Sequence, residues 1–332
     1  AMALTTKVND APVIRDQIFI CEPILEVQSN QVTLVHQSAR EYLLREMPDD
    51  NPTLERFRIN AEKAHAQLGR ICLDVVEKSD LEQKGWLDLR DRSVLQKSPL
   101  LNYAALHWPE HLKRSSIYSD MDLSLSRPLF RRKSSLLANW CESYQEATST
   151  FFGSHSSPLL EIASYFGIET LTQKLLKCDW RVRLRGLGGW KNEKDGQALG
   201  LAALKGHETI VLLLLAHNVH INSRGEDGST ALMKAAEGGH EVIVQLLLAK
   251  GALVNEIDQY GRTALTMAAE TGKESIVQLL VTQGADINVI HEDSETPLIH
   301  ASGGGHYAIV RLLIAHGADI NAFGRYGFHG YR

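Results

Sequence analysis

The sequence predicts a mainly α-helical protein whose second half is a solenoid of stacked repeats. The first observation is a strict spacing of 33 residues between four glycines, Gly206, Gly239, Gly272 and Gly305. An Ile-Val pair and an asparagine follow each glycine at constant distances, and the asparagines are Asn222, Asn255, Asn288 and Asn321. A unit of this size cannot bury its own apolar face, so such units close their cores against one another.

Each unit is predicted to hold two short helices. Thr230, Thr263 and Thr296 stand where an N-cap would open the first helix, an alanine pair lets neighbouring helices approach, and the glycine ends that helix. Ile-Val and Leu-Leu pairs then form the buried stripe of a second helix. We therefore expect four leucines to be almost fully buried: Leu246, Leu247, Leu279 and Leu280.

These residues resemble the ankyrin repeat. Units open with Asp227-Gly-Ser-Thr-Ala-Leu, Tyr260-Gly-Arg-Thr-Ala-Leu and Glu295-Thr-Pro-Leu, and close with Gly251-Ala, Gly284-Ala-Asp and Gly317-Ala-Asp. The histidine usual after the Thr-Pro-Leu start is replaced by Gly200, Met233, Thr266 and Ile299. We expect one hydrogen bond between repeats to be missing for that reason.

The chain before the repeats begins with a predicted β-hairpin. Apolar and polar residues alternate at 24–27 and 32–35, around a polar turn at 28–31. Ser38 and Glu41 have the spacing of a capping box, which predicts a helix directly after the hairpin.

Further helices are predicted along the connecting region. Between Thr53 and Ser79, apolar residues step by three and four and mark one face of a long helix: Phe57, Ala61, Ala64, Leu68, Ile71, Cys72, Val75 and Val76. Ser98-Pro99 and Ser157-Pro158 each place a capping serine before a proline at the first helical position. The second of these opens a degenerate first repeat, which is followed by an insertion of six residues placed within 179–195.

A wider resemblance covers nearly the whole chain. Three stretches, in this order, are similar to fungal NACHT-ankyrin proteins of the STAND or NOD-like receptor type: Val32 to Leu44, Leu101 to Trp108 and Ala163 to Ile168. The resemblance implies that residues 1–52 are the tail of a winged-helix-like subdomain, 53–155 a helical connector and 156–332 the solenoid, with four regular repeats and a truncated last one. It also implies a signalling role related to innate immunity, with nucleotide bound only by a domain outside this chain.

Composition and charge narrow the range of partners. The net charge of −5 indicates neither nucleic acid nor a membrane surface as a partner, and the apolar run 210–216 is far shorter than the roughly 20 residues of a membrane helix. Four widely spaced cysteines without a Cys-x-x-Cys motif fit the reducing cytoplasm. Because residues 325–332 begin a further repeat without its helices, we expect a longer protein.

No catalytic, cofactor or metal site is predicted. Gly272-Lys273-Glu274 lacks the rest of a phosphate-binding loop, and the glycines at 185–190 favour a flexible insertion over a dinucleotide loop. His36, Ser38 and Glu41 favour a helix cap over a nucleophile system.

Two other sets of residues leave alternatives open. His207, His240 and His306 share one repeat position, which favours helix capping over a shared metal ion, because they lie about one repeat, roughly 10 Å, apart. The basic stretch 127–133 is either a solvated loop or a nucleic-acid contact, nuclear signal or kinase site.

The leading functional hypothesis is a protein-binding module that acts through the concave face of the repeats. An enzyme with a site in residues 1–155, or a passive scaffold, are the alternatives. Residues of the turns and of the first-helix ends are the candidate contacts: Glu226, Asp227, Ser229, Glu237, Gln259, Tyr260, Arg262, Glu270, Glu292, Asp293 and Glu295. Seven are acidic and one is basic, which predicts a basic partner around Tyr260 as aromatic anchor.

Overall fold

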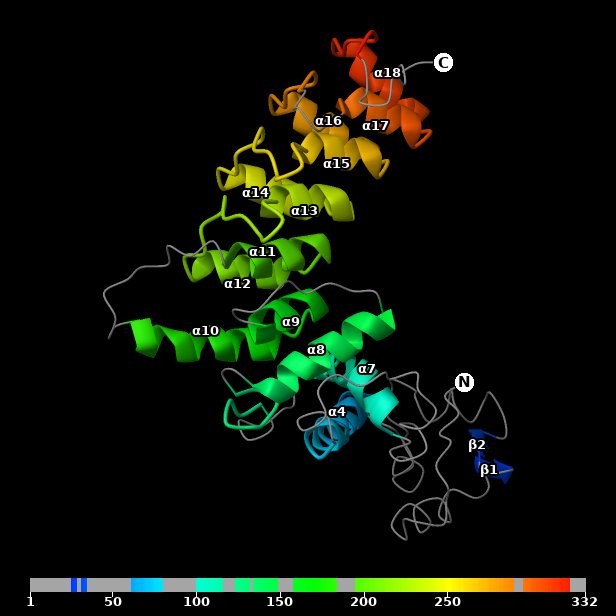
Figure 1. Cartoon of the computed structure of the whole chain (residues 1–332), viewed down its shortest axis with the longest axis vertical. Coiled ribbons are helices and arrows are strands. Elements are labelled where there is room, and N and C mark those ends of the chain that lie inside the picture. The colour runs from blue at the N-terminus through cyan, green and yellow to red at the C-terminus, as the bar shows by residue number, and fades with distance from the viewer. Residues whose placement is uncertain are drawn as a thin grey trace, which may run out of the picture. The chain divides into compact units, whose positions relative to one another are not determined.

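The protein divides into two compact units, Ala1–Phe151 and Phe152–Arg332, which run from blue to green and from green to red in Figure 1. The computed structural model describes residues 25–28, 31–34, 61–79, 100–115, 123–131, 134–148, 158–183, 195–289 and 295–322. None of the helices in these ranges is long and apolar enough to cross a membrane.

In the first unit, strands β1 (Leu25–Gln28) and β2 (Gln31–Leu34) form an antiparallel hairpin. Leu25 pairs with Leu34 and Gln28 with Gln31, so each strand reaches one residue into the predicted turn. The hairpin is confirmed. The helix expected after Ser38 lies outside the described residues, and the winged-helix assignment stays a prediction.

Helix α4 (Ala61–Glu77) confirms the predicted amphipathic helix, although residues 53–60 lie outside the described ranges. Its buried stripe consists of Ala66, Gly69, Cys72, Leu73 and Val76. Ile71 is 52% exposed, so its predicted place on the buried face is wrong. Successive helical residues point about 100° apart, and the side chain before Cys72 turns toward solvent.

Helices α7 (Leu101–Lys113) and α8 (Ser135–Thr148) pack through two tryptophans. Trp108 and Trp140 are fully buried with ring centroids 5.0 Å apart, and Trp140 Nε1 donates to the Ala105 carbonyl at 2.8 Å. Leu100 is the N-cap of α7, and Ser98 and Pro99, where the cap was predicted, lie outside the described residues.

The basic stretch near residue 127 is partly structural. Arg127 is bound by Asp74 and Glu77 of α4 at 2.6 and 2.9 Å, so it is not a solvated side chain. Ser134 accepts a hydrogen bond from the Leu137 N–H at 3.1 Å and caps α8. These contacts fix the segment before α8 against α4. Arg132 and Lys133 lie outside the described residues.

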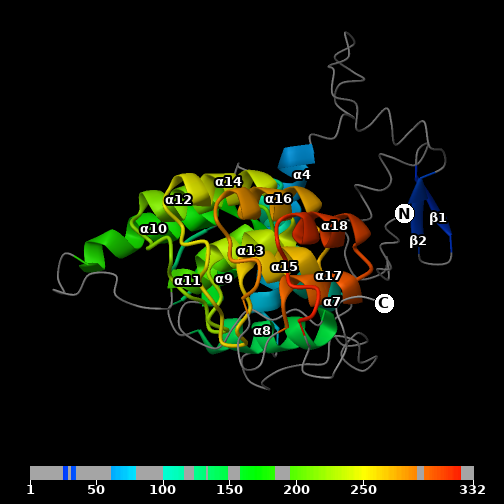
Figure 2. The ribbon, with the colours of Figure 1, turned by 90° about the horizontal axis from the view of Figure 1, so that it is seen from above.

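The second unit stacks helix pairs. The first helices are α9 (Pro158–Phe166), α11 (Asp195–Leu204), α13 (Ala231–Gly238), α15 (Ala264–Glu270) and α17 (Pro297–Gly303). The second helices are α10 (Glu169–Arg183), α12 (Glu208–Ala216), α14 (Glu241–Ala249), α16 (Glu274–Thr282) and α18 (Tyr307–Ala315). From α11 onward, Figure 2 shows the first helices in one row and the second helices in another.

The predicted helix boundaries in the repeats are confirmed. Thr230, Thr263 and Thr296 cap α13, α15 and α17, each accepting a hydrogen bond from the backbone N–H three residues on. Gly239 ends α13 with φ at 82°, in the left-handed region that favours glycine. Helix α10 has 15 residues where α12 has 9, so the insertion after the first repeat begins as added helix.

The core of the repeats is the Ile-Val stripe with one leucine of each pair. Leu247 and Leu280 are fully buried, but Leu246 and Leu279 are only partly buried, so the prediction of full burial is wrong for these two. Adjacent helical residues face directions about 100° apart, and only the second leucine points between the layers.

A histidine joins each of three repeats to the repeat before it. His207, His240 and His306 are N-cap residues of α12, α14 and α18, but their side chains do not cap. Each Nε2 instead lies 2.9 to 3.1 Å from a carbonyl of the preceding repeat, at Tyr165, Leu204 and Glu270. The capping interpretation is therefore wrong. We call this contact the histidine clasp.

Glycine is required beneath each clasp. A Cβ at Gly206 would lie 2.5 Å from the His240 ring, and one at Gly272 would lie 2.5 Å from the His306 ring. Lys273 takes the histidine position in α16, and its stem lies over Gly239. Among the described residues, no hydrogen bond joins its ammonium to the preceding repeat.

The periodic asparagines make a second link between repeats. Asn222, Asn255 and Asn288 accept hydrogen bonds from Leu253, Asp286 and Asp319 N–H groups at 2.8 to 2.9 Å. Each bond joins equivalent loops of successive repeats, which accounts for the spacing seen in the sequence.

Leu280→Ala should cost about 2 to 5 kcal/mol of unfolding free energy, because it opens a cavity in the core. Leu279→Ala is the matched control and should cost less than half as much, since that side chain is already partly in water. Urea denaturation measures both. Equal losses would mean that the orientation of α16 is wrong.

His240→Ala should cost about 1 to 3 kcal/mol, because it leaves the Leu204 carbonyl unpaired and the space over Gly206 empty. Lys273→Ala, at the same repeat position, should stay within about 0.5 kcal/mol. Denaturation of the two variants side by side tests the clasp, and an unchanged His240→Ala variant would contradict it.

Candidate functional site

Two hairpin turns carry most of the candidate residues and lie against each other. The first turn closes through the Gly225 N–H and the Ser229 carbonyl at 2.8 Å, and the second through Asp258 N–H and Arg262 carbonyl at 3.0 Å. The Gln259 N–H donates to the Asp227 carbonyl at 3.2 Å. The two tips therefore form one continuous edge before α13 and α15.

The side chain of Arg224 stabilises both turns. Its guanidinium binds the Gly228 carbonyl of its own turn, and the Ile257 carbonyl and the Glu256 carboxylate of the next. One side chain thus ties both turns together.

The first tip contains an ion-pair chain. Lys234 of α13 lies 2.9 Å from Asp227 and 3.0 Å from Glu237. Burial alone would raise the pKa of Asp227, but hydrogen bonds from Lys234 and Ser229 outweigh it and hold that pKa below its usual value. Burial lowers the pKa of Lys234, yet the two carboxylates raise it above its usual value. Asp227 and Lys234 are therefore both charged at neutral pH.

The second tip is built on a buried aspartate. Asp258 is 4% exposed and accepts hydrogen bonds from the Tyr260 and Arg262 N–H groups and from Arg262 Nε, each at 2.9 Å. The guanidinium of Arg262 lies 5.1 Å from the centre of the Tyr260 ring. Tyr260 remains 53% exposed, so a rigid turn holds an aromatic side chain out to solvent.

The remaining candidates are distributed unevenly. Glu226, Gln259 and Glu270 are exposed, while Glu295 is half-buried. Ser229 is 1% exposed, so its predicted role as an exposed contact is wrong. Glu292 and Asp293 lie outside the described residues.

Lys234 and Asp258 belong to this surface, although the sequence analysis did not select them. Lys234 stands three residues before Glu237, the spacing of neighbours on one helix face, so the pair could have been found. Asp258 stands two residues before Tyr260, the spacing of an Asx turn. Lys234 balances part of the predicted acidity, because it pairs with Asp227 and Glu237, whereas Asp258 is a further acid that pairs with Arg262.

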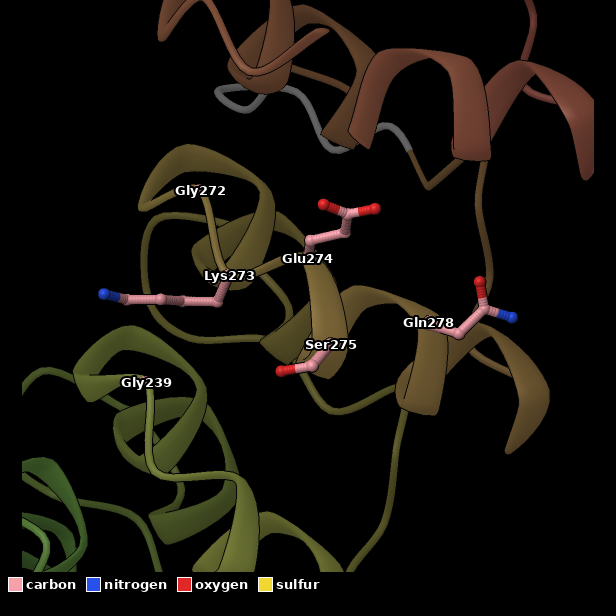
Figure 3. A pocket seen from close by; sticks show the side chains of 6 residues that line it. All are labelled: Gly239, Gly272, Lys273, Glu274, Ser275 and Gln278. Atoms are coloured by element: carbon pink, nitrogen blue, oxygen red, sulfur yellow. The ribbon is translucent and has the colours of Figure 1, made fainter. Parts of the chain in front are cut away.

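A shallow groove of about 640 Å³ lies where the first helices end and α16 begins, and it is lined by Gly239, Gly272, Lys273, Glu274, Ser275 and Gln278. Figure 3 shows the Lys273 side chain extended across the loop that holds Gly239. Gly272 and Lys273 stand between two helices rather than after a strand, so they do not form a phosphate-binding loop. In the described part of the chain, no group of three or more His, Cys, Asp or Glu residues is placed to hold a metal ion.

A buried acid lies near the first tip. Glu161 of α9 is 3% exposed, and its Oε2 has no hydrogen-bond partner among the described residues. It occupies the position that Gly200, Met233, Thr266 and Ile299 take in the later repeats. Burial, and then the nearby charge of Glu226, raise the pKa of Glu161 to about 8. Glu161 is therefore a neutral carboxylic acid at neutral pH.

A comparison with protein-family models identifies the repeats. The model described as ankyrin repeats in three copies matches residues 159–258 and 243–324. These segments overlap and together run from residue 159 to residue 324, which is 166 of the 332 residues and thus half of the chain. Among curated proteins, no relative matches.

The buried Glu161 should make stability depend on pH. Its folded pKa of about 8 lies above the ordinary value of 4.5, so between these values the folded state holds a proton that the unfolded state releases. Stability should fall as pH rises across this window, by about 2 to 5 kcal/mol in total.

Glu161→Gln keeps the shape of the side chain and cannot ionise, so it is the control for this prediction. Urea denaturation of both proteins from about pH 5 to about pH 8.5 isolates the contribution of Glu161 as a difference. A difference that stays constant with pH would show that Glu161 is ionised in the folded protein.

Proposed function

The chain belongs to the ankyrin-repeat family, and we propose that it binds a protein partner on the face formed by the hairpin tips and the first helices. Ankyrin repeats form a protein-interaction module. The observation that carries the proposed face is the exposed Tyr260 on a turn fixed by Asp258, next to the tip that holds Asp227.

The turn that carries Tyr260 is held in one conformation by contacts within the protein itself. Rigid aromatic side chains supply large contact area with little loss of conformational entropy, and such residues dominate the energetics of interfaces. Tyr260 meets this description, because its backbone is held by Asp258 and its ring lies beside Arg262. The polar groups of Glu226, Gln259 and Glu270 would form the rim.

We propose that the partner is basic around the tyrosine anchor. Glu270 and Glu295 are not paired with a cation among the described residues. Glu270 ends the first helix of the repeat that Tyr260 opens, and Glu295 stands just before the first helix of the next repeat. Lys234 limits the excess of negative charge by pairing with Asp227 and Glu237, so complementarity would be local rather than spread over the solenoid.

We further propose that the chain is part of a fungal NACHT-type signalling protein of the cytoplasm. The support is the order of three stretches, 32–44, 101–108 and 163–168, ahead of the repeats. In this proposal residues 1–52, 53–155 and 156–332 are the winged-helix-like tail, the connector and the sensing repeats. Nucleotide would bind outside this chain.

The binding prediction compares two exposed tyrosines. Tyr260→Ala should weaken partner binding by about 2 kcal/mol, roughly thirtyfold, because an interface anchor is lost. Tyr307→Ala is the matched control, since Tyr307 is 81% exposed at the start of α18, a second helix, and should leave affinity unchanged. Glu270→Lys with Glu295→Lys should slow association at low salt.

The full chain is used as bait, captured proteins are identified by mass spectrometry, and affinities of the variants are then measured by calorimetry. A protein that the wild type and Tyr307→Ala capture, and that Tyr260→Ala loses, supports the proposal. Equal affinity of all variants, with circular dichroism unchanged, would leave a passive scaffold as the better account.

A further inference from the structure

Three side chains form a hydrogen-bonded row between α4 and α7 of the first unit. Tyr103 Oη lies 2.8 Å from His111 Nε2, and His111 Nδ1 lies 2.8 Å from His65 Nδ1. The two imidazole ring centroids are 5.1 Å apart. His111 is only 4% exposed, so its two ring nitrogens are matched by protein groups in the interior.

The short contact between the two imidazoles restricts their protonation. A hydrogen bond between two Nδ1 atoms needs one N–H donor and one lone pair, so the pair shares a single proton. The hydroxyl of Tyr103 can donate or accept and fits either arrangement. One positive ring is tolerated, because a protonated His65 can still donate to the Nδ1 lone pair of a neutral His111. When both rings are protonated, two N–H groups and two positive charges face each other, and the contact can no longer form.

Groups on both helices favour the state with one shared proton. From α4, Cys72 faces Tyr103; from α7, the ring of His107 lies 4.6 Å from that of Tyr103, and Arg114 pairs with Glu110 at 2.6 Å. Burial first, and then the positive charges of His65, His107 and Arg114, lower the pKa of His111 to about 4, against an opposing effect of Glu110. Burial and Arg114 also lower the pKa of His65.

We propose that the His65–His111 pair is an acid-sensitive latch that holds α4 against α7 while the two rings share one proton and releases it when both are protonated. α4 and α7 pack along each other, and this pair lies within their contact. A histidine whose folded pKa is lowered stabilises the fold above the unfolded value of 6.5, and this contribution disappears as pH falls toward the folded pKa. The latch is closed at neutral pH and opens between about pH 6.5 and about pH 4.

Two measurements on the full chain test this. Nuclear magnetic resonance should show the His111 ring titrating well below the range of an exposed histidine. Hydrogen exchange of the α4 and α7 amides, corrected for intrinsic rates, should show opening that is roughly ten- to thirtyfold more frequent at about pH 5 than at about pH 7.

His65→Gln is the informative variant, because glutamine can still hydrogen-bond to His111 but does not titrate. It should lose most of the pH response of α4 and α7. His107→Gln removes an exposed neighbouring imidazole and should keep the response. A full response in His65→Gln would overturn the latch, as would titration of wild-type His111 near pH 6.5; the second result decides the question even if a variant fails to fold.

Discussion

The candidate binding face depends on how each repeat stacks on the one before it, and the histidine clasp fixes this stacking at the junctions on either side of the two hairpin tips, through His240 and His306. A short helix pair has little freedom once its second helix is fixed at the first residue to a carbonyl of its neighbour. The glycine under each ring removes the Cβ that would hold the helices apart. Stacking of the first helices then places successive hairpin tips side by side, where the Gln259 N–H can reach the Asp227 carbonyl.

The period of the repeats predicted the caps, the turns and the presence of a buried stripe, because each of these is a local property that recurs. It could not predict which leucine of a pair is buried, since Leu279 and Leu280 obey the same period and differ only in direction. For the same reason Ser229 was expected to be exposed, while the turn closes over it. The contact between each histidine and the preceding repeat was not predicted, because its partner is a backbone carbonyl. Every residue has such a carbonyl, so the residue type at that position gives no indication of the contact.

In the first unit, the contacts between helices could not be predicted from the sequence. Helical periodicity was sufficient to predict α4, but the residues that join α4 to its neighbours are far away in the sequence. Arg127 binds Glu77 across 50 residues and His65 meets His111 across 46. Such contacts depend on how helices cross, which no spacing within one helix reveals. The negative charge of the candidate binding face was overestimated for a related reason, because Lys234 was not considered with Asp227.

Lysine at position 273 leaves the junction between the two hairpin tips without a histidine clasp. On the tip side of this junction, Arg224 and the Gln259 N–H hold the two turns together. On the helix side, the ring and its carbonyl bond are replaced by a flexible stem lying over Gly239. The asparagine link remains at this junction, because Asn255 accepts a hydrogen bond from the Asp286 N–H and donates one to the Gly284 carbonyl. The two repeats that carry the hairpin tips are therefore joined through their turns and their interhelical loops, without an imidazole between the helices.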